Sequence, residues 1–455
     1  LFEVQHRLGN IHANLKDYDN AMLCYLDVLD FQRRTNGDED INVADLLFNL
    51  GNIYIEKEEL DKSLECHEES LRISTQVLGN KNVALAENMH YIGNVLMQQG
   101  EHKSSLEYYD DALALLRDVE DRNEIMNAAI ARNLHRKGAV HEKIGEHEMA
   151  LSCLKEALKV GKNILGKDSV EISNILNSLG NVHRNLFNLE IALNCYEQSL
   201  HIRLGMNDPL SIANTKNNIG AVLTAQGYDE RASAFYADAL RLKTLQLGCN
   251  NVEIARTLSN IGQVFLDQKR LDTAMKYFQE GLRIFRLTQG DKHHDVALCI
   301  HNIGLILEKE SDLNKPLQCY MEALRIFKKT VGDDYLMASY TLHNLGVIHS
   351  KQRDFQKAID FFKESLRIKL TNLGPDHEET AQTQHCLGEA FREINELDNS
   401  FENYKRALKN RVKYFGTDSE EVSDSLFGIG KVRFLRGENE EALACLDESL
   451  RVKRM

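Results

Sequence analysis

Apolar residues recur along this chain three and four positions apart, which is the spacing of one buried face on an α-helix. The pattern also repeats as a whole, because a glycine inside one apolar stretch returns at steps of 42, 42, 45, 42 and 40 residues and then of 42 throughout. Leucine or isoleucine precedes this glycine in every unit except that of Gly138. The repeated glycines are Gly9, Gly51, Gly93, Gly138, Gly180, Gly220, Gly262, Gly304, Gly346, Gly388 and Gly430. Self-similarity at a nearly fixed period predicts a repeat architecture.

Each unit carries further fixed positions, which are counted from its glycine. A small residue stands at +12 in ten of the eleven units, with Pro316 as the exception, and an aromatic residue stands at +16 in eight of them. Position +20 is leucine in every unit, from Leu29 to Leu450. These offsets trace one face of a second helix, so each unit predicts a hairpin of two helices. We expect the glycine to let the second helix approach the first, and the small residues to form the flat surface opposite it.

The connections between units contain a glycine at +28 in eight of the ten junctions, where the end of a helix favours the left-handed conformation. Two junctions differ in length: the one near 118–127 is three residues longer, and the one near 205–209 is two residues shorter. Pro209 favours the start of the following helix, and Pro316 falls in the first turn of its own helix after Asp312. We therefore predict one repeat array over residues 1–455 with two irregular junctions.

These positions resemble the tetratricopeptide repeat, whose pattern joins Leu-Gly to a downstream Ala, an aromatic residue and a second Ala. The 42-residue unit, with segments such as SLRISTQVLGNKNVALAEN and SLRIKLTNLGPDHEETAQT, is similar to the kinesin light chain and nephrocystin class. The resemblance implies an all-α fold, a right-handed superhelical solenoid of about eleven helix-turn-helix hairpins with a concave groove. It also implies that positions −6, −3, −2, +1, +4 and +5 of each first helix face that groove.

The composition argues against several classes of function. The net charge of −14 disfavours general binding to nucleic acid or to anionic lipid, because both require a concentrated basic surface. Cysteines recur at one repeat position, which predicts packing and not disulfide or metal chemistry, in Cys24, Cys66, Cys153, Cys195, Cys319 and Cys445. The sequence has no CxxC pair, no N-glycosylation sequon and no signal-like start, so we expect a reducing, intracellular location in the cytoplasm.

Asparagine recurs at two of the expected groove positions. It stands at −2 in Asn49, Asn218, Asn260, Asn302 and Asn344, and at +1 in Asn10, Asn52, Asn94 and Asn181. A carboxamide has both donors and an acceptor, so a row of them can pair with the backbone of an extended peptide without reading its side chains. The alternative is that these amides bond to a neighbouring helix or to water, and the pattern favours neither reading.

Basic residues also map to expected groove positions, namely Arg184, Arg256, Lys309 and Lys351. They predict that an acidic peptide is among the accepted ligands. Chaperone-binding relatives of the repeat clamp a terminal carboxylate with five residues, of which Asn181, Asn218 and Arg256 match three. Asn177 and Asn260 replace two basic residues of that clamp, so we do not expect a terminal-carboxylate clamp here.

We predict no catalytic residue, no metal site and no cofactor. The sequence contains no nucleotide-binding loop, no H-E-x-x-H motif and no G-x-S-x-G motif. Histidines at position −3, such as His301 and His343, occur once per repeat, about 10 Å apart by helix packing, which is too far apart to share a zinc ion. We therefore expect these histidines to pack or to line the groove, and we assign no role to the pair His293–His294.

The leading functional hypothesis is a scaffold or adaptor that binds an extended peptide or a partner helix in the groove. One alternative is a sensor array that regulates a larger signalling ATPase or enzyme. Another is self-assembly through uncapped ends, because the final predicted helix carries Leu443, Leu446 and Leu450 without an obvious polar cap.

Overall fold

The computed structural model describes residues 2–119, 123–164, 166, 168–309 and 312–454. Over these residues the chain forms 22 α-helices and no strand, which confirms the predicted all-α fold. None of the described helices is both long enough and apolar enough to cross a membrane. The chain divides into two compact units: unit 1 ends at Tyr228 and unit 2 begins at Asp229. A single continuous array with a right-handed turn stays a prediction.

Unit 1 contains the helices α1 to α11. Their bounds are α1 Phe2–Asn14, α2 Tyr18–Asn36, α3 Ile41–Glu56, α4 Leu60–Leu78, α5 Leu85–Gln99, α6 His102–Arg117, α7 Glu124–Lys143, α8 His147–Ile164, α9 Val170–Asn185, α10 Leu189–Met206 and α11 Pro209–Ala225.

Unit 2 contains the helices α12 to α22. Their bounds are α12 Asp229–Leu247, α13 Val252–Asp267, α14 Leu271–Gln289, α15 His294–Leu307, α16 Asn314–Thr330, α17 Leu336–Lys351, α18 Phe355–Asn372, α19 Glu378–Glu393, α20 Leu397–Phe415, α21 Glu420–Leu435 and α22 Asn439–Arg454.

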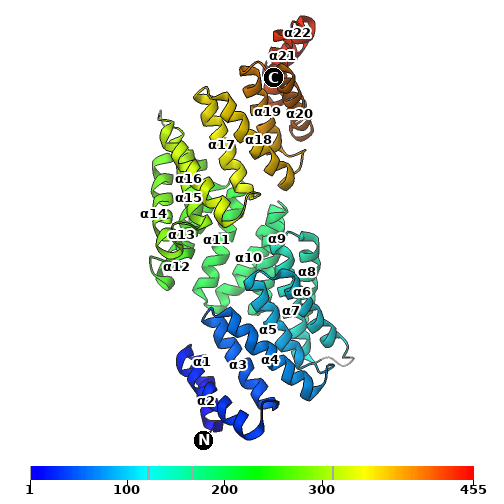
Figure 1. The fold of residues 1–455 in the computed structure, drawn as a ribbon, viewed down its shortest axis with the longest axis vertical. Coiled ribbons are helices and arrows are strands. Elements are labelled where there is room, and N and C mark those ends of the chain that lie inside the picture. The colour runs from blue at the N-terminus through cyan, green and yellow to red at the C-terminus, as the bar shows by residue number, and fades with distance from the viewer. Residues whose placement is uncertain (1, 120–122, 165, 167, 310–311, 455) are drawn as a thin grey trace. The chain divides into compact units, whose positions relative to one another are not determined.

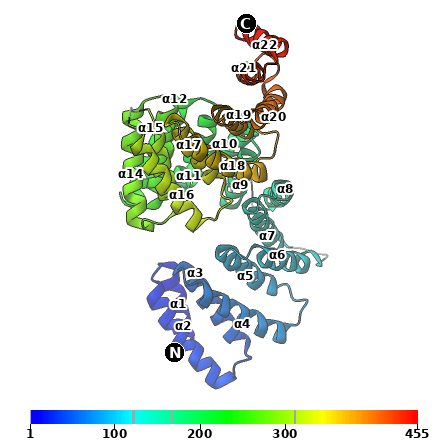
Figure 2. The ribbon, with the colours of Figure 1, turned by 45° about the horizontal axis from the view of Figure 1, so that its top comes forward.

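Helices that follow one another in the chain pack as hairpins, for example α3 with α4 in unit 1 and α13 with α14 in unit 2 (Figure 1). The pair α5 and α6 lies side by side in both ribbon views (Figures 1 and 2). Within each unit the first helices of successive hairpins also contact one another, as α5 does with α7 and α19 with α21. Second helices of the same unit show no comparable contact over the described residues. The first helices therefore form the inner layer of each unit.

The repeated glycine makes room for the aromatic ring at +16 of the same hairpin. A Cβ atom added to Gly346 would lie 2.6 Å from Cε1 of Phe362, and one added to Gly180 would lie 2.6 Å from Cε1 of Tyr196. These distances are shorter than carbon atoms tolerate, so a side chain at the glycine would displace the ring. The predicted close approach is confirmed, and the group that the glycine faces is the side chain at +16, which is Leu154 beside Gly138 and Leu446 beside Gly430.

Small residues at +12 are buried in every described hairpin, as predicted. Where serine replaces alanine, its hydroxyl is not left without a partner. Ser105 Oγ donates to the Gly93 carbonyl oxygen at 2.7 Å, and Ser400 Oγ donates to that of Gly388 at 2.7 Å. The hydroxyl therefore adds a hydrogen bond across the hairpin at the site of closest approach.

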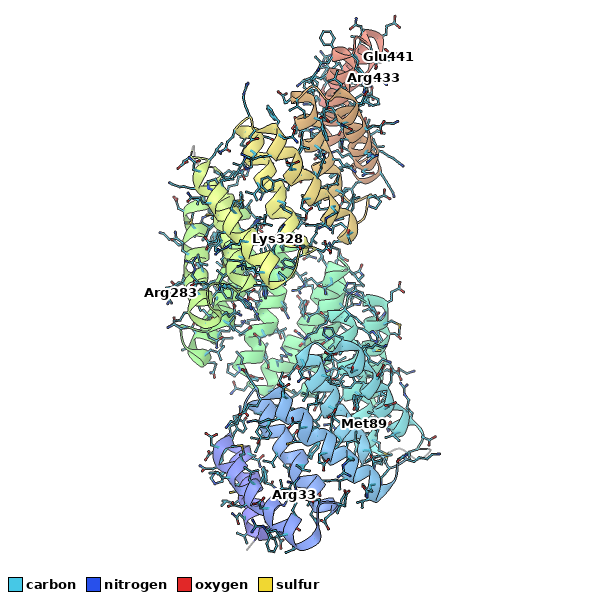
Figure 3. All side chains as sticks on the ribbon, viewed as in Figure 1. Arg33, Met89, Arg283, Lys328, Arg433 and Glu441 are labelled. Atoms are coloured by element: carbon cyan, nitrogen blue, oxygen red, sulfur yellow. The ribbon has the colours of Figure 1, made fainter. Side chains whose placement is uncertain are left out.

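The hydrophobic core of each unit consists of several clusters along its stacked hairpins. In unit 1 one cluster joins Leu113 of α6 to Leu154 of α8 and Leu179 of α9, with Met89 of α5 packed against it (Figure 3). In unit 2 the largest cluster joins helices from α13 to α18. The repeated cysteines contribute less than predicted, because Cys153 is buried while the other five are half-buried. Burial raises the pKa of the Cys66 thiol to about 11.

The eight junction glycines have positive φ angles, but four of them, Gly37, Gly79, Gly290 and Gly416, are not in the left-handed helical region that we expected. Gly79 has φ 81° and ψ 157°, and Gly416 has φ 83° and ψ 177°. This combination is almost exclusive to glycine, because any Cβ atom would clash with the backbone. The preference for glycine at +28 is thus stronger than a helix C-cap alone would require.

The two irregular junctions start the next helix with different capping residues. Asn123 accepts a hydrogen bond from the backbone N–H of Met126 at 2.8 Å and starts α7, while residues 120–122 of the junction near 118–127 lie outside the described residues. In the shorter junction Asn207 is left-handed and Asp208 caps α11, whose first residue is Pro209. Pro316 is buried in the first turn of α16, as predicted.

A buried basic residue at +23 connects successive hairpins, and this feature was not predicted. Lys369 Nζ of α18 donates to the carbonyl oxygen of Glu379 at 3.3 Å, to its carboxylate at 2.8 Å and to Thr383 Oγ1 at 3.1 Å, all on α19. Arg411 of α20 contacts Glu421 and Ser425 in the same way. Arg203 and Lys243 occupy the equivalent position. The feature of the sequence that could have predicted this contact is a lysine or arginine at +23, on a largely apolar helix face.

Candidate peptide-binding groove

The asparagines at +1 lie on the first helices and bond within their own hairpin. The tyrosine hydroxyl at +16 donates to the asparagine Oδ1 in three hairpins: Tyr25 to Asn10 at 2.6 Å, Tyr109 to Asn94 at 2.8 Å and Tyr196 to Asn181 at 2.7 Å. Each pair connects the inner helix to the ring that fills the space above the glycine. The oxygens of these amides are therefore engaged, while their N–H groups are not used by this contact.

Asn52 occupies the same position in the second hairpin, but there His67 replaces the tyrosine. Neither ring nitrogen of His67 has a hydrogen-bond partner among the described residues, and the same is true of Asn52 Oδ1. Burial lowers the pKa of His67 to about 4, so the imidazole is neutral at pH 7. The pair interrupts the series of amide–hydroxyl bonds.

The asparagines at −2 are half-buried on their first helices, and two of them donate toward the −3 residue of the preceding hairpin. Asn218 Nδ2 lies 3.2 Å from Asn177 Oδ1, and Asn49 Nδ2 lies 3.5 Å from His6 Nε2. Asn344 lies within hydrogen-bonding reach of the Tyr320 hydroxyl. In unit 2, Asn260, Asn302 and Asn344 stand at one position of α13, α15 and α17. These amides contribute to packing between hairpins and keep part of their surface accessible.

The histidines at −3 lie between the first helices of neighbouring hairpins. His301 Nδ1 lies 2.9 Å from Thr341 Oγ1, and His343 Nδ1 lies 3.2 Å from Thr383 Oγ1. Burial lowers the pKa to about 4 in His90, His135, His301 and His385, and to about 3 in His343. They serve as neutral packing residues, and all of them bond to the next hairpin except His385, which lies 3.2 Å from Arg411 of its own hairpin.

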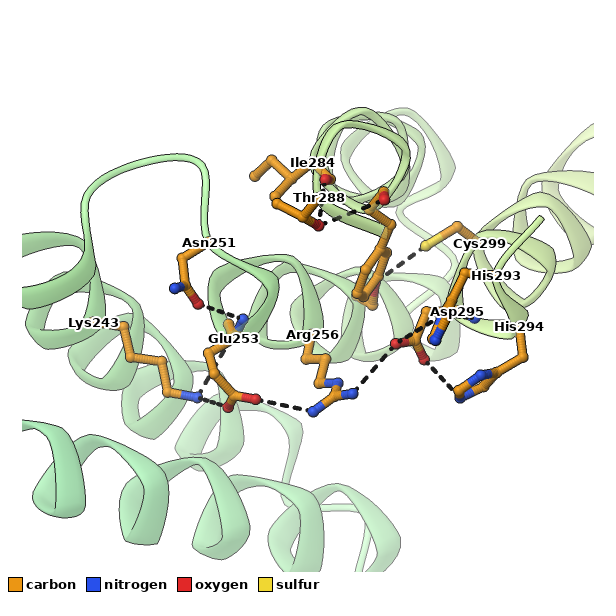
Figure 4. A network of polar contacts seen from close by, with 12 residues as sticks. Lys243, Asn251, Glu253, Arg256, Ile284, Thr288, His293, His294, Asp295 and Cys299 are labelled. Atoms are coloured by element: carbon orange, nitrogen blue, oxygen red, sulfur yellow. Dashed lines mark hydrogen bonds and ion pairs between the residues drawn. The ribbon is translucent and has the colours of Figure 1, made fainter. Parts of the chain in front are cut away.

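Arg256 belongs to an ion-pair network at the start of α13 and α15 (Figure 4). Its guanidinium lies 2.9 Å from the Glu253 carboxylate and 3.4 Å from that of Asp295, which is 8% exposed. Glu253 also pairs with the buried Lys243 at 3.1 Å. Arg256 thus neutralises a buried carboxylate and offers a ligand only the remaining side of its guanidinium.

The other basic residues predicted for the groove differ in what they contact. Lys351 Nζ lies 2.7 Å from the Glu308 carboxylate of the preceding hairpin. Arg184 is half-buried near Glu142, and it opposes the rise that burial causes in the pKa of that carboxyl. Lys309 is exposed. Arg256 and Lys351 are exposed too, but each is held by an ion pair, whereas none is found for Lys309 among the described residues.

One group of three described side chains has the composition of a metal site, at His293, His294 and Asp295, whose ligand atoms lie within 4.8 Å of one another. Their contacts do not fit that role. His293 Nδ1 accepts the backbone N–H of Asp295 at 3.2 Å as the cap of α15, and the Asp295 carboxylate already faces Arg256. A neighbouring guanidinium and a helix N-terminus both oppose a bound cation.

The family model of the tetratricopeptide repeat matches residues 1–76, 46–118, 129–204, 211–287, 253–329, 296–371 and 379–455. No curated protein is significantly similar to the chain in sequence.

Several solved structures are similar to this chain at low sequence identity, and the first two described here share its fold. Aspartyl phosphate phosphatase F from Bacillus subtilis superposes with a TM-score of 0.53 at 13% identity, over 82% of this chain and 95% of that one. A Rap protein in complex with competence and sporulation factor gives a TM-score of 0.53 at 14% identity, over 81% and 98% of the two chains. BtubC (BKLC) from P. vanneervenii gives 0.43 at 19% identity, over 50% and 92%.

Proposed function

Because this chain belongs to the tetratricopeptide repeat family, we propose that it is an interaction scaffold or adaptor that holds an extended peptide or a partner helix along its first helices. The main support is the series Asn260, Asn302 and Asn344 in unit 2, which stands at one position of three successive first helices. Partly accessible carboxamides at a regular spacing suit a ligand that is itself extended. The Rap protein of the same fold, which was solved with a bound factor, is a further reason to look for a ligand.

Binding, rather than catalysis, is the function that these contacts support. The polar groups of the inner layer bond one another in a repeated pattern, whereas an active site brings together unlike groups once. The phosphatase of the same fold shares 13% identity with this chain, which is evidence for the fold alone. An acidic ligand was predicted from Arg184, Arg256, Lys309 and Lys351, and we keep that prediction for Lys309 alone. A reducing intracellular location remains part of the proposal.

The test is an affinity capture from native lysate with the full chain and with the variant N260A/N302A/N344A. Asn218 is left unchanged, because it lies in unit 1, apart from the series of unit 2. The matched control is N194A/N314A/N399A, which alters three exposed asparagines on the second helices α10, α16 and α20.

We expect partners to be lost from the first variant and retained by the control, with both variants unfolding at the wild-type temperature. An identical partner list for all three proteins would contradict binding along these asparagines. The lists of captured partners would also separate a groove ligand from the alternatives of a sensor array and of self-assembly. Self-assembly predicts that the chain captures further copies of itself.

A further inference from the structure

We propose that a cavity between the second, third and fourth hairpins binds an apolar side chain of a peptide, with a lysine or arginine beside it. The cavity has a volume of about 410 Å³ and lies wholly within unit 1. This proposal takes from the proposed function only the premise that the ligand is a peptide. It differs from the acidic ligand predicted from the basic residues of other hairpins.

The cavity is lined by buried apolar residues together with the buried polar residues Ser70, Ser74 and Asn133, and the charged residues of its lining, which form its rim, are exposed. Leu116 and Ala86 are buried in the lining, and Phe48 is half-buried. The charged lining residues are Asp45, Glu87 and Arg132, and all three are exposed. Volumes of several hundred Å³ with apolar walls and a few polar groups are typical of ligand sites.

The three charged residues occupy one repeat position, −6, on α3, α5 and α7. These first helices are neighbours, since α5 contacts both α3 and α7. The rim therefore presents two carboxylates on adjacent helices, followed by one guanidinium. A cationic side chain of the ligand is attracted to the first two and is repelled by the third.

The carboxylates of the rim have no ion-pair partner among the described residues. In contrast, Arg256 at position −6 of unit 2 is paired with both Glu253 and Asp295. Partial burial beside the cavity raises the pKa of the Asp45 carboxyl, and the smaller effect of His6 in the opposite direction does not offset it. A lysine or arginine of a ligand would supply the missing opposite charge.

Asn88 provides an independent sign that the site is incomplete. Its side chain lines the cavity and is 7% exposed, and its Oδ1 atom has no hydrogen-bond partner in the part of the chain that the structure describes. A buried carbonyl oxygen without a donor is costly. Because less than 1 Å² of this oxygen is accessible, a donor of the ligand reaches it only once the Asn88 side chain has turned toward the cavity.

The test titrates the full chain with three capped, fluorescently labelled nonapeptides by fluorescence anisotropy. The first has a central leucine between two lysines in a glycine–serine background. The second replaces both lysines with glutamate, and the third replaces the leucine with alanine. We expect the first peptide to bind about tenfold more tightly than either of the others.

Two variants and a matched control locate the binding. D45N/E87Q removes the carboxylates, and A84W places an indole at an exposed lining position, so each is expected to weaken the first peptide about tenfold. E65Q/E68Q removes the same charge from exposed positions of α4 outside the lining and is expected to leave the affinity unchanged. R132A should bind the first peptide at least as tightly as wild type.

The proposal is overturned if the first peptide fails to bind, if the glutamate peptide binds as tightly, or if the α4 control loses as much affinity as D45N/E87Q. These outcomes are separate from the capture experiment, which depends on the asparagines of unit 2. Loss of asparagine-dependent partners with no binding of the lysine–leucine peptide would reject only the cavity. Binding of that peptide with an unchanged partner list would reject only the asparagine groove.

Discussion

For individual polar residues of the inner layer, the hairpin that follows them in the chain sets their burial and their hydrogen-bond partners. His343 on α17 is buried and faces Thr383 of α19, which also accepts a hydrogen bond from Lys369. Its imidazole must be neutral there, because burial and the nearby ammonium both disfavour a second proton. The same position in other hairpins carries histidines with the same property, so pH acts on many inter-hairpin contacts together.

Folding stability should therefore fall as the medium is acidified. The pKa of His343 is about 3 in the folded chain, below its usual value of 6.5, so the unfolded chain takes up a proton first. The contribution of His343 is fully present above pH 6.5 and is lost as pH falls from 6.5 toward 3. Between pH 7.5 and 5.5 this loss amounts to about 1.4 kcal/mol.

The variant H343Q should remove that share of the pH dependence. Urea unfolding at the two pH values is expected to show a loss of stability that is about 1.4 kcal/mol smaller than in wild type. H201Q, at an exposed position of α10, is the control and should leave the pH dependence unchanged. An unaltered dependence in H343Q would contradict the assignment of a neutral, buried imidazole.

At the scale of the element, the turn inside each hairpin imposes one backbone conformation. Wherever the residue at +7 is described, it has a positive φ angle, whether or not it is glycine. Gly145 has φ 81° and Phe187, at the same position of the next hairpin, has φ 58°. The turn geometry follows from how the two helices must pack, so the sequence adapts to it and does not determine it.

Phe187 should accordingly be replaceable by glycine with a gain in stability. Its ring is 82% exposed, so little packing is lost. The relief of left-handed strain, about 1–2 kcal/mol, exceeds the entropic cost of glycine, about 0.5–1 kcal/mol. We expect F187G to raise the free energy of unfolding by about 0.5 kcal/mol, measured by urea unfolding.

The reverse substitution at the equivalent turn is the matched control. G145F places a side chain on a backbone with φ 81° and should lower stability by about 1 kcal/mol. Equal effects of both substitutions would show that the conformation of the turn does not govern stability at +7.

At the scale of the molecule, stability depends on the contacts between successive hairpins, because each hairpin buries its apolar face only against its neighbours. Lys369 is one such contact, and it is completely buried between α18 and α19. Its loss should weaken the attachment of the hairpins that follow it within unit 2. The repeat architecture therefore predicts a local consequence of a single buried substitution.

K369A should destabilise α19 to α22 more than the preceding helices. We expect a loss of about 2–4 kcal/mol from the lost hydrogen bonds and the cavity left by the side chain. Hydrogen exchange read by mass spectrometry should show faster exchange in these four helices. K357A, which removes the exposed partner of Asp354 on the same helix, should change stability by less than about 1 kcal/mol. Uniformly faster exchange throughout unit 2 would contradict local weakening.

The sequence alone determined the helical hairpins, because their signals are local and recur in every unit. The glycine, the small residue at +12 and the leucine at +20 follow from helix period and close packing, and Pro209 and Pro316 follow from backbone sterics. The aromatic at +16 could be predicted as buried, whereas its contact with the glycine needed the geometry of the hairpin.

Only the tertiary structure decided what the polar residues of the inner layer do. Asn10 and Asn52 stand at the same repeat position, yet Asn10 accepts from Tyr25 while the oxygen of Asn52 has no partner among the described residues. Likewise Asp45, Glu87 and Arg132 surround one cavity although they are more than forty residues apart in sequence. Hydrogen bonds and charges act over a few ångströms, and the positions of side chains from different hairpins are set by stacking.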